Sequence, residues 1–365
     1  MIRLPGLSDS HVHMREPGAT HKEDWLSGTA AAVAGGFTSV LAMPNTQPPI
    51  TEEGSFKSVI QKAQRNAYCD FGQFAGAGPQ NARHVSQFAP RSAGLKMYLD
   101  QTYGPLRLDS MVYWMEHFKH WPRDLPIVAH AEGRTMAAVI LIAALYERSV
   151  HIAHVSRREE ILLIRKARER GLQVTCEVTP HHLLLTEDDI TQLGSGRSEV
   201  RPRLASARDR DALWENLSVI DCLATDHAPH TLAEKDGNDP PPGYPGLETA
   251  LPLMLTAVAE GRLSIDRLVQ MMHVNPVRIF RLPEQQQTWV EIDPDAAGEI
   301  KAERMYSRCG WTPFEGWPVR GRVSRVVLRG VDVFHEGRVI GKPGFGKNVR
   351  DQSVGEVDQS PEESF

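Results

Sequence analysis

The stretch Leu7–Gly18, LSDSHVHMREPG, decides the fold of this chain, because it ends a short apolar run with two histidines and then stops at Pro17. Side chains alternate across a β-strand, so His11 and His13 project from the same face of one strand. We therefore expect a strand whose C-terminal end presents two imidazoles that can share a metal ion. The alternative is a pair of buried histidines that are hydrogen-bonded to neighbouring backbone.

Seven more short apolar runs follow, each before a helix-like stretch or a loop that leads into one. Strands that alternate with helices predict parallel βαβ units, and eight units within roughly 230 residues favour a closed barrel over an open doubly wound sheet. The sequence thus predicts an α/β protein, a (β/α)8 TIM barrel with a small accessory region from the C-terminal segment. The expected barrel strands lie at 4–13, 38–44, 69–76, 93–99, 126–132, 150–156, 174–182 and 221–229.

The rest of the chain divides by composition. We expect the barrel to occupy residues 1–310, accessory strands that pack on the barrel to occupy 311–350, and a disordered acidic tail to occupy 351–365. Residues 231–249 are rich in proline and glycine and predict a functional loop, after which helical sequence resumes. The chain begins almost on its first strand, which leaves little room for an N-terminal accessory subdomain and suggests a domain excised from a longer protein.

Composition narrows the class of function. The 365 residues are 41% hydrophobic, which is enough for a large core, and the formal net charge of −5 comes without a basic patch, so nucleic acid is not an expected partner. The four cysteines lie far apart and form no CxxC pair, which favours a reducing, cytoplasmic compartment. We find no signal peptide and no apolar run long enough to cross a bilayer.

Polar residues interrupt the expected strands at their C-terminal ends, where TIM barrels place catalytic groups. Four histidines and one aspartate exceed the three protein ligands of a usual mononuclear zinc site, so two metal ions are the natural interpretation. Nitrogen and oxygen ligands without sulfur suit zinc and are compatible with manganese or cobalt. The polar strand ends are His11, His13, Asn45, Lys96, His130, His154, Glu177, His181 and Asp226.

Lys96 is the odd member of this set, because a lysine beside two cations would be repelled. It can be a surface lysine whose stem covers apolar neighbours. Carbamylation by carbon dioxide would instead turn its amine into an anionic carboxylate that bridges both ions.

The motifs DSHVHMREPG, AMPNT, GLKMYL, VAHAE, HIAHVS, CEVTPHHL, ATDHAPHT and PPPGYPGLET together resemble the dihydroorotases of the amidohydrolase superfamily. The similarity covers residues 2–350 and is strongest to animal-type dihydroorotases, which are fused to carbamoyl-phosphate synthetase and aspartate transcarbamoylase. It implies reversible cyclisation of N-carbamoyl-L-aspartate to L-dihydroorotate plus water in pyrimidine biosynthesis, and a homodimer. It also implies two Zn²⁺ per chain, bridged by carbamylated Lys96 and held by His11, His13, His130, His154 and Asp226.

The resemblance also implies roles for other residues. Asp226 and Lys96 would be catalytic together with Thr102 and Tyr103, which lie in a stretch that can act as a lid. Glu177, His181 and His182 stay ambiguous, and we favour a supporting or structural role over metal ligation. Residues assigned to substrate binding are Arg15, Asn45, Arg201, His230, Pro245 and Gly246.

Plainer interpretations stay open at this point. Arg15 can be a surface ion-pair partner, and Asn45 can form a turn with its own backbone. Another cyclic amidohydrolase, such as an allantoinase or a dihydropyrimidinase, would share the metal residues but not the set Arg15, Asn45 and His230. An inactive scaffolding homologue should have lost metal ligands, and all six are present.

Overall fold

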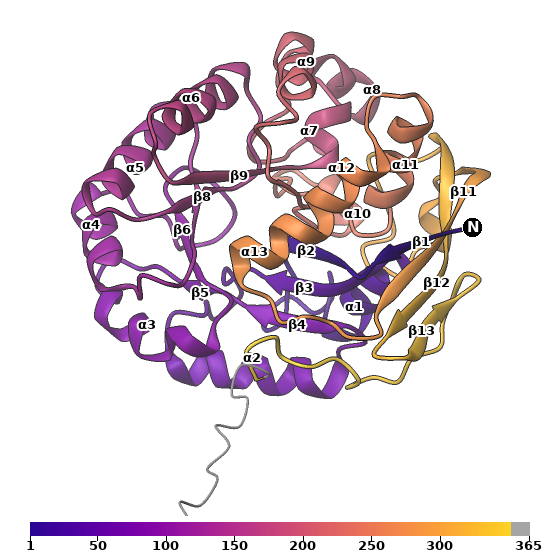
Figure 1. Ribbon diagram of the computed structural model, residues 1–365, viewed down its shortest axis with the longest axis horizontal. Helices are drawn as coiled ribbons and strands as arrows, with labels where there is room; N and C mark the ends of the chain where they lie inside the picture. Colours follow the sequence, from indigo (N-terminus) through magenta and orange to yellow (C-terminus); the bar gives the residue numbers. More distant parts are fainter. Residues whose placement is uncertain (352–365) are drawn as a thin grey trace, which may run out of the picture.

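A computed structural model describes residues 1–351, in which parallel strands form a barrel inside a ring of helices (Figure 1). The strands pair in two arcs, in the orders β2-β3-β4 and β10-β9-β8-β7-β6-β5, and the chain runs from β4 through Phe74 directly into β5. The predicted (β/α)8 barrel is confirmed, with its third strand divided into β4 and β5. The barrel strands are β2 Leu7–Val12, β3 Phe37–Ala42, β4 Asp70–Gln73, β5 Ala75–Gly76, β6 Leu95–Tyr98, β7 Ile127–His130, β8 Val150–Ile152, β9 Val174–Val178 and β10 Cys222–Leu223.

The barrel closes between β2 and β10 around one buried side chain, Asp9. Its Oδ1 accepts hydrogen bonds from the backbone N–H groups of Thr225 and His11, both at 3.1 Å, and its Oδ2 accepts from the Thr225 hydroxyl at 2.5 Å. The backbone N–H of His13 then donates to the carbonyl of His227 at 2.7 Å. Closure therefore brings the first and the last barrel strands together at the point where their histidine and aspartate side chains emerge.

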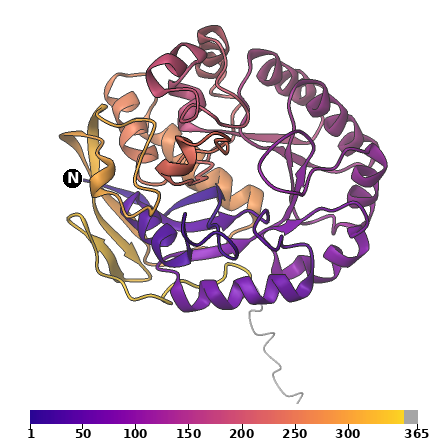
Figure 2. The same cartoon turned by 180° about the vertical axis from the view of Figure 1, so that it is seen from behind.

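Helices cover most of the outside of the barrel, and strands from the two ends of the chain lie along the remaining side (Figures 1 and 2). Several begin with a side-chain cap, as where Ser206 accepts from the N–H of Asp209, and these caps satisfy donors that the first helical turn leaves free. The helices are α1 Trp25–Ala34, α2 Glu53–Asn66, α3 Ala82–Phe88, α4 Met111–His120, α5 Gly133–Leu145, α6 Arg158–Glu169, α7 Pro180–Leu184, α8 Ile190–Leu193, α9 Ala207–Glu215, α10 Leu232–Lys235, α11 Ala250–Ala259, α12 Ile265–Val269 and α13 Asn275–Phe280, with a π-helical turn at Gln270–Val274 and 3₁₀ turns at Ala89–Arg91, Glu187–Asp189 and Ala302–Arg304.

The accessory sheet differs from the expectation at both ends of the chain. It has five strands in the order β1-β11-β12-β13-β14, so residues 2–5 belong to it and not to the first barrel strand. The sequence analysis also missed β11, which pairs with β1 and β12. A strand that pairs with segments far along the chain carries no local signal of its partner. The strands are β1 Ile2–Pro5, β11 Trp289–Glu299, β12 Pro318–Leu328, β13 Val331–His335 and β14 Arg338–Val339.

The four cysteines are free and buried. Among residues 1–351, no helix is long and apolar enough to span a bilayer. The predicted disordered tail lies, from residue 352 on, outside the described residues. The predicted boundaries at 310 and 350 stay predictions.

We expect Asp9→Asn to lower the free energy of unfolding by about 2 kcal/mol, because an amide nitrogen would then face buried donors of Thr225. Urea denaturation of the two proteins measures this difference. Ser39→Ala is a matched control, since it removes one buried hydroxyl that donates to Ser8 at 2.7 Å, and its effect should be at most about 1 kcal/mol. Equal unfolding midpoints for Asp9→Asn and wild type would contradict this role for Asp9.

Candidate metal centre and substrate cavity

Four histidines and one aspartate meet at the C-terminal mouth of the barrel, and all five are buried. The ring centroid of His11 lies 5.4 Å from that of His13 and 5.3 Å from that of His154, and the rings of His130 and His154 are 4.6 Å apart. Atoms of His11, His13 and Asp226 that can bind a metal lie within 4.8 Å of one another. The structure thus brings together the side chains that the sequence analysis had grouped.

Neighbouring acceptors fix where the protons of His11 and His13 lie. Nδ1 of His11 contacts Glu177 Oε1, and a carboxylate can only accept, so this nitrogen carries the hydrogen. Nδ1 of His13 lies 2.7 Å from Asn45 Oδ1, and the Asn45 amide is oriented because its Nδ2 donates to the carbonyl of Tyr103 at 3.0 Å. In both rings Nε2 is therefore left with a lone pair.

These two lone pairs point at a third acceptor. Nε2 of His13 lies 3.1 Å and Nε2 of His11 3.3 Å from Oδ1 of Asp226. Burial lowers the pKa of both imidazoles and raises that of Asp226. One proton on Asp226 could satisfy one of the two nitrogens, whereas a metal cation would satisfy all three atoms at once. The donor set therefore fits a metal ion.

A second group of ligands lies beside the first. Nδ1 of His130 is 2.8 Å from Nε2 of His154, and Nδ1 of His154 has no hydrogen-bond partner among residues 1–351. Nζ of Lys96 lies 3.5 Å from His11 Nε2, and its side chain is fully buried, so the surface interpretation of this lysine is wrong. Burial lowers the pKa of Lys96 to about 8. A buried amine with this pKa is partly neutral near neutral pH, as carbamylation requires.

Glu177 contacts His11 on the side of the ring that faces away from Asp226. Its Oε2 accepts from the Ser10 hydroxyl at 3.0 Å and lies 3.2 Å from Nε2 of His151, whose Nδ1 is 2.9 Å from the Thr175 hydroxyl. Burial alone would raise the pKa of Glu177, but the imidazoles of His11 and His151 outweigh it and hold that pKa well below its usual range. An ionised carboxylate that orients a ligand imidazole is the usual support of a metal site.

His181 and His182 lie on α7, and His182 is held by structural contacts. Its Nδ1 contacts the Thr179 hydroxyl at 2.8 Å and its Nε2 the carbonyl of Pro202 at 3.1 Å. Burial lowers the pKa of both imidazoles. These contacts agree with the structural role that we favoured.

Three site residues have backbone conformations that non-glycine residues rarely adopt. His154, Asp226 and Arg15 have φ angles of 35°, 46° and 56°. Such left-handed residues cost of order 1–3 kcal/mol each and cluster at functional sites. Each of the three residues lies two or three positions after the end of a barrel strand, at the mouth of the barrel.

Arg15 is buried, and the ring of His230 lies against its guanidinium. The guanidinium Nε donates to the carbonyl of Pro229 at 3.0 Å, and one terminal nitrogen is 2.9 Å from His230 Nε2. Lys22 lies on the other side of this ring, with Nζ 2.9 Å from Nδ1. Burial and these two cations lower the pKa of His230. Because Arg15 is buried, the surface ion-pair interpretation is wrong. Lys22 also pairs with Glu234 at 2.9 Å, so the guanidinium of Arg15 is the cation that faces the inner cavity.

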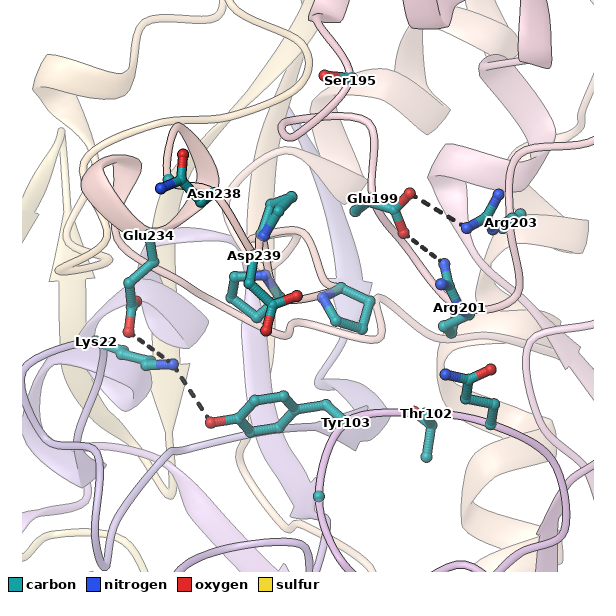
Figure 3. A pocket seen from close by; sticks show the side chains of 16 residues that line it. Lys22, Thr102, Tyr103, Ser195, Glu199, Arg201, Arg203, Glu234, Asn238 and Asp239 are labelled. Carbon is teal, nitrogen blue, oxygen red and sulfur yellow. Dashed lines mark hydrogen bonds and ion pairs between the residues drawn. The ribbon is translucent and has the colours of Figure 1, made fainter.

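The loop at Thr102 and Tyr103 separates two cavities. The inner one, of about 20 Å³, is lined by the metal-centre histidines, Asp226, Arg15 and Asn45, and the outer one, of about 840 Å³, opens above it. Thr102, Tyr103 and Arg201 line both. Figure 3 shows the outer cavity, with the Tyr103 hydroxyl directed at Lys22. The inner cavity holds about one water molecule, so it has to enlarge before it can hold a substrate.

Arg201 is held at the rim of the outer cavity by Glu199, 2.7 Å away, which also pairs with Arg203 (Figure 3). Pro245 and Gly246 do not line either cavity. The N–H of Gly246 donates to Nδ1 of the buried His227 at 3.1 Å.

Other residues of the inner cavity were missed by sequence reasoning. Pro242, Gly243 and Ala228 line it in the place expected for Pro245 and Gly246, and no local signal distinguishes these glycine-rich positions. Tyr98 also lines it. This residue had a signal, because it lies two positions after Lys96 and so on the same face of β6.

Comparison with known proteins agrees with these observations. The model of the amidohydrolase family matches residues 2–285. The chain is 55% identical to the multifunctional protein CAD of Squalus acanthias over 97% of its own length, but it spans only 16% of that protein. It is 36% identical to a dihydroorotase of Pyrococcus furiosus, with 94% of this chain and 84% of the other covered.

Two solved structures are similar along 95% of the chain. The L-hydantoinase (dihydropyrimidinase) from Arthrobacter aurescens has a TM-score of 0.90 at 26% identity, with 88% of that chain covered. The inactive dihydroorotase-like domain of a CAD-like multifunctional protein from Chaetomium thermophilum has a TM-score of 0.83 at 30% identity, with 98% covered. The fold thus occurs in relatives with and without activity, so the site has to distinguish them.

We expect Glu177→Gln to weaken zinc binding about 10- to 100-fold, because the charge that orients His11 is lost. Competition with a chromogenic chelator measures the zinc dissociation constant. Glu160→Gln is the matched control, since Glu160 is equally buried but accepts from the backbone N–H of Gly133, which begins α5, and of Ser156, just before α6. Unchanged zinc affinity in Glu177→Gln would show that Glu177 does not support the site.

Proposed function

The chain belongs to the amidohydrolase family, and on this premise we propose that it is a dihydroorotase. It would interconvert N-carbamoyl-L-aspartate and L-dihydroorotate plus water, a step of pyrimidine biosynthesis. The observation that carries the proposal is the convergence of His11, His13 and Asp226 acceptors beside a buried cationic cluster of Arg15 and Lys22. The first group suits a metal ion and the second suits the carboxylate of the substrate.

Two zinc ions would be held at the barrel mouth. His11, His13 and Asp226 would hold one, His130 and His154 the other, and carbamylated Lys96 would bridge them. Carbamylation joins the neutral Lys96 nitrogen to the carbon of carbon dioxide and releases one proton, which leaves a carboxylate anion. The low pKa of this buried amine and its position among the imidazoles support the assignment.

Asp226 would move the proton of the reaction. When bound, the zinc ions act as Lewis acids that polarise the ring amide carbonyl and acidify a water molecule. In ring opening Asp226 accepts a proton as the water oxygen adds to the carbonyl carbon, and then gives it to the ring nitrogen as the C–N bond breaks. Ring closure reverses each step, so the ionised Asp226 first takes a proton from the carbamoyl nitrogen and then gives it to the oxygen that leaves as water. Because the open acid is a carboxylate at neutral pH, ring closure also takes up one proton from solution.

The positive cluster beside the metal centre would bind the substrate carboxylate. Arg15 can offer two parallel N–H donors, and Asn45 lines the same cavity. His230 lines neither cavity but contacts the Arg15 guanidinium, so it is proposed to act by holding Arg15 in place. Arg201 is proposed as a further contact from the rim of the cavity. Contacts from Pro245 and Gly246 stay a prediction and would require the Gly246 N–H to leave His227.

Thr102 and Tyr103 are proposed as the catalytic lid. The Tyr103 ring lies over the guanidinium of Arg15 at 5.1 Å, and its backbone carbonyl accepts from Asn45. A lid held in this way would exclude water once the substrate is bound.

Partners and location are proposed on weaker support. The chain matches part of a multifunctional protein, which supports fusion to carbamoyl-phosphate synthetase and aspartate transcarbamoylase in the cytoplasm. Exposed apolar side chains on the neighbouring helices α4 and α5 support a homodimer, because a second copy would cover them. They are Met111, Val112, Met115, Leu141 and Leu145.

The substrate assay separates the alternatives. We expect kcat/KM for L-dihydroorotate to exceed that for dihydrouracil, which lacks the carboxylate, by at least about 100-fold, because the buried Arg15 guanidinium would face no carboxylate on the second ring. Arg15→Met should remove most of this preference. Faster turnover of hydantoin, dihydrouracil or allantoin would indicate another cyclic amidohydrolase, and no turnover of any ring would indicate an inactive homologue.

The zinc content of the same proteins tests the proposed two-metal site independently of the substrate assay. Wild type should hold close to two zinc ions per chain by elemental analysis, whereas Lys96→Ala should lose them together with its activity. A fully active protein with one zinc per chain would contradict the bridged arrangement.

The two directions should have opposite pH preferences, because ring opening to a carboxylate releases one proton and ring closure takes one up. The initial rate of ring opening should rise as pH increases, since its first step needs Asp226 as the carboxylate. The initial rate of ring closure should fall over the same interval. Initial rates from pH 5 to 9 measure both directions, and two profiles that rise together would contradict this proton balance.

A further inference from the structure

The hydroxyl of Tyr98 is a buried polar group without a hydrogen-bond partner among residues 1–351. Tyr98 ends strand β6, is 2% exposed and lines the inner cavity. A buried donor without a partner destabilises the fold, so such groups are rare in native proteins. A phenylalanine would fill the same space without this loss. A substrate atom in the inner cavity could accept a hydrogen bond from this hydroxyl.

The surroundings of Tyr98 place it at the metal centre. The Nζ atom of Lys96 lies 5.3 Å from the centroid of the Tyr98 ring, and the ring of His130 lies 6.2 Å away. Asp226 and Arg15 line the same inner cavity as Tyr98. A phenol carries its proton at neutral pH, so this hydroxyl can donate a hydrogen bond into a cavity shared by the proposed proton carrier and the proposed carboxylate binder.

We propose that Tyr98 is a catalytic residue whose hydroxyl donates a hydrogen bond to the carbonyl oxygen that gains negative charge in the reaction. This rests on the proposed function. During ring opening the water oxygen bonds to the carbonyl carbon, and the π electron pair of the C=O bond moves onto the carbonyl oxygen. The pair returns when the C–N bond breaks, and the phenolic proton stays on Tyr98 throughout. The reacting carbonyl is the partner because the ring contacts Lys96 and His130, which belong to the metal centre.

A donor of this kind acts most strongly in the transition state, where the charge on oxygen is largest. Tyr98→Phe should therefore lower kcat for ring opening by on the order of 100-fold, with KM changed by less than about threefold. Its zinc content should equal that of wild type. Its Tm should be equal or higher, because the substitution removes a buried donor that has no partner in the free protein.

Tyr306→Phe is the control for the loss of a phenolic hydroxyl. The Tyr306 hydroxyl donates to the carbonyl of Gly337 and accepts from Val339 N–H, both at 3.0 Å, next to the accessory sheet. This variant should have a lower Tm and an unchanged kcat. Opposite changes in the two variants would separate the catalytic from the structural effect of a hydroxyl.

Three results would overturn the assignment of Tyr98. They are a kcat within threefold of wild type, a rise in KM alone, and a loss of activity that follows loss of zinc or a lower Tm. A wild-type protein that does not open dihydroorotate would instead overturn the proposed function, and the role of Tyr98 with it. Normal wild-type activity with an active Tyr98→Phe variant would overturn only the role of Tyr98.

Discussion

Three acceptor atoms that face one another in a buried place are the constraint on which the rest of the structure depends. A single cation can satisfy the two Nε2 atoms of His11 and His13 and one oxygen of Asp226 at once. Glu177 and Asn45 enforce this arrangement by holding the hydrogens on the opposite ring nitrogens. Glu177 and Asn45 therefore orient the proposed metal ligands as well as satisfying buried hydrogen-bonding groups.

Barrel closure is what creates that constraint. His11 and Asp226 are more than two hundred positions apart, and the bonds of Asp9 to Thr225 bring them together. The same closure places Arg15 beside His230. The proposed metal centre and the proposed binding site for the substrate carboxylate therefore both form where the first and last barrel strands meet. The proposed chemistry depends on where these two strands meet, and the loop at Tyr103 lies between this place and the outer cavity.

The barrel could be predicted from the sequence because its signals are local: short apolar runs, helical stretches between them and polar residues at the strand ends. The metal-centre group could be predicted because the ends of parallel strands share one mouth. The pairing of β1 with β11 could not, since it depends on contacts nearly three hundred residues apart. Neither could the proton position on His11, which depends on the orientation of Glu177, nor the presence of Gly243 in the cavity wall.

Anomalous X-ray scattering at the zinc edge, from crystals grown with zinc, tests the central claim most directly. The account predicts one peak between His11, His13 and Asp226, and a second beside His130 and His154. Both peaks should lie within reach of one group on Lys96. Crystals that bind zinc elsewhere but show no peak between His11, His13 and Asp226 would contradict it.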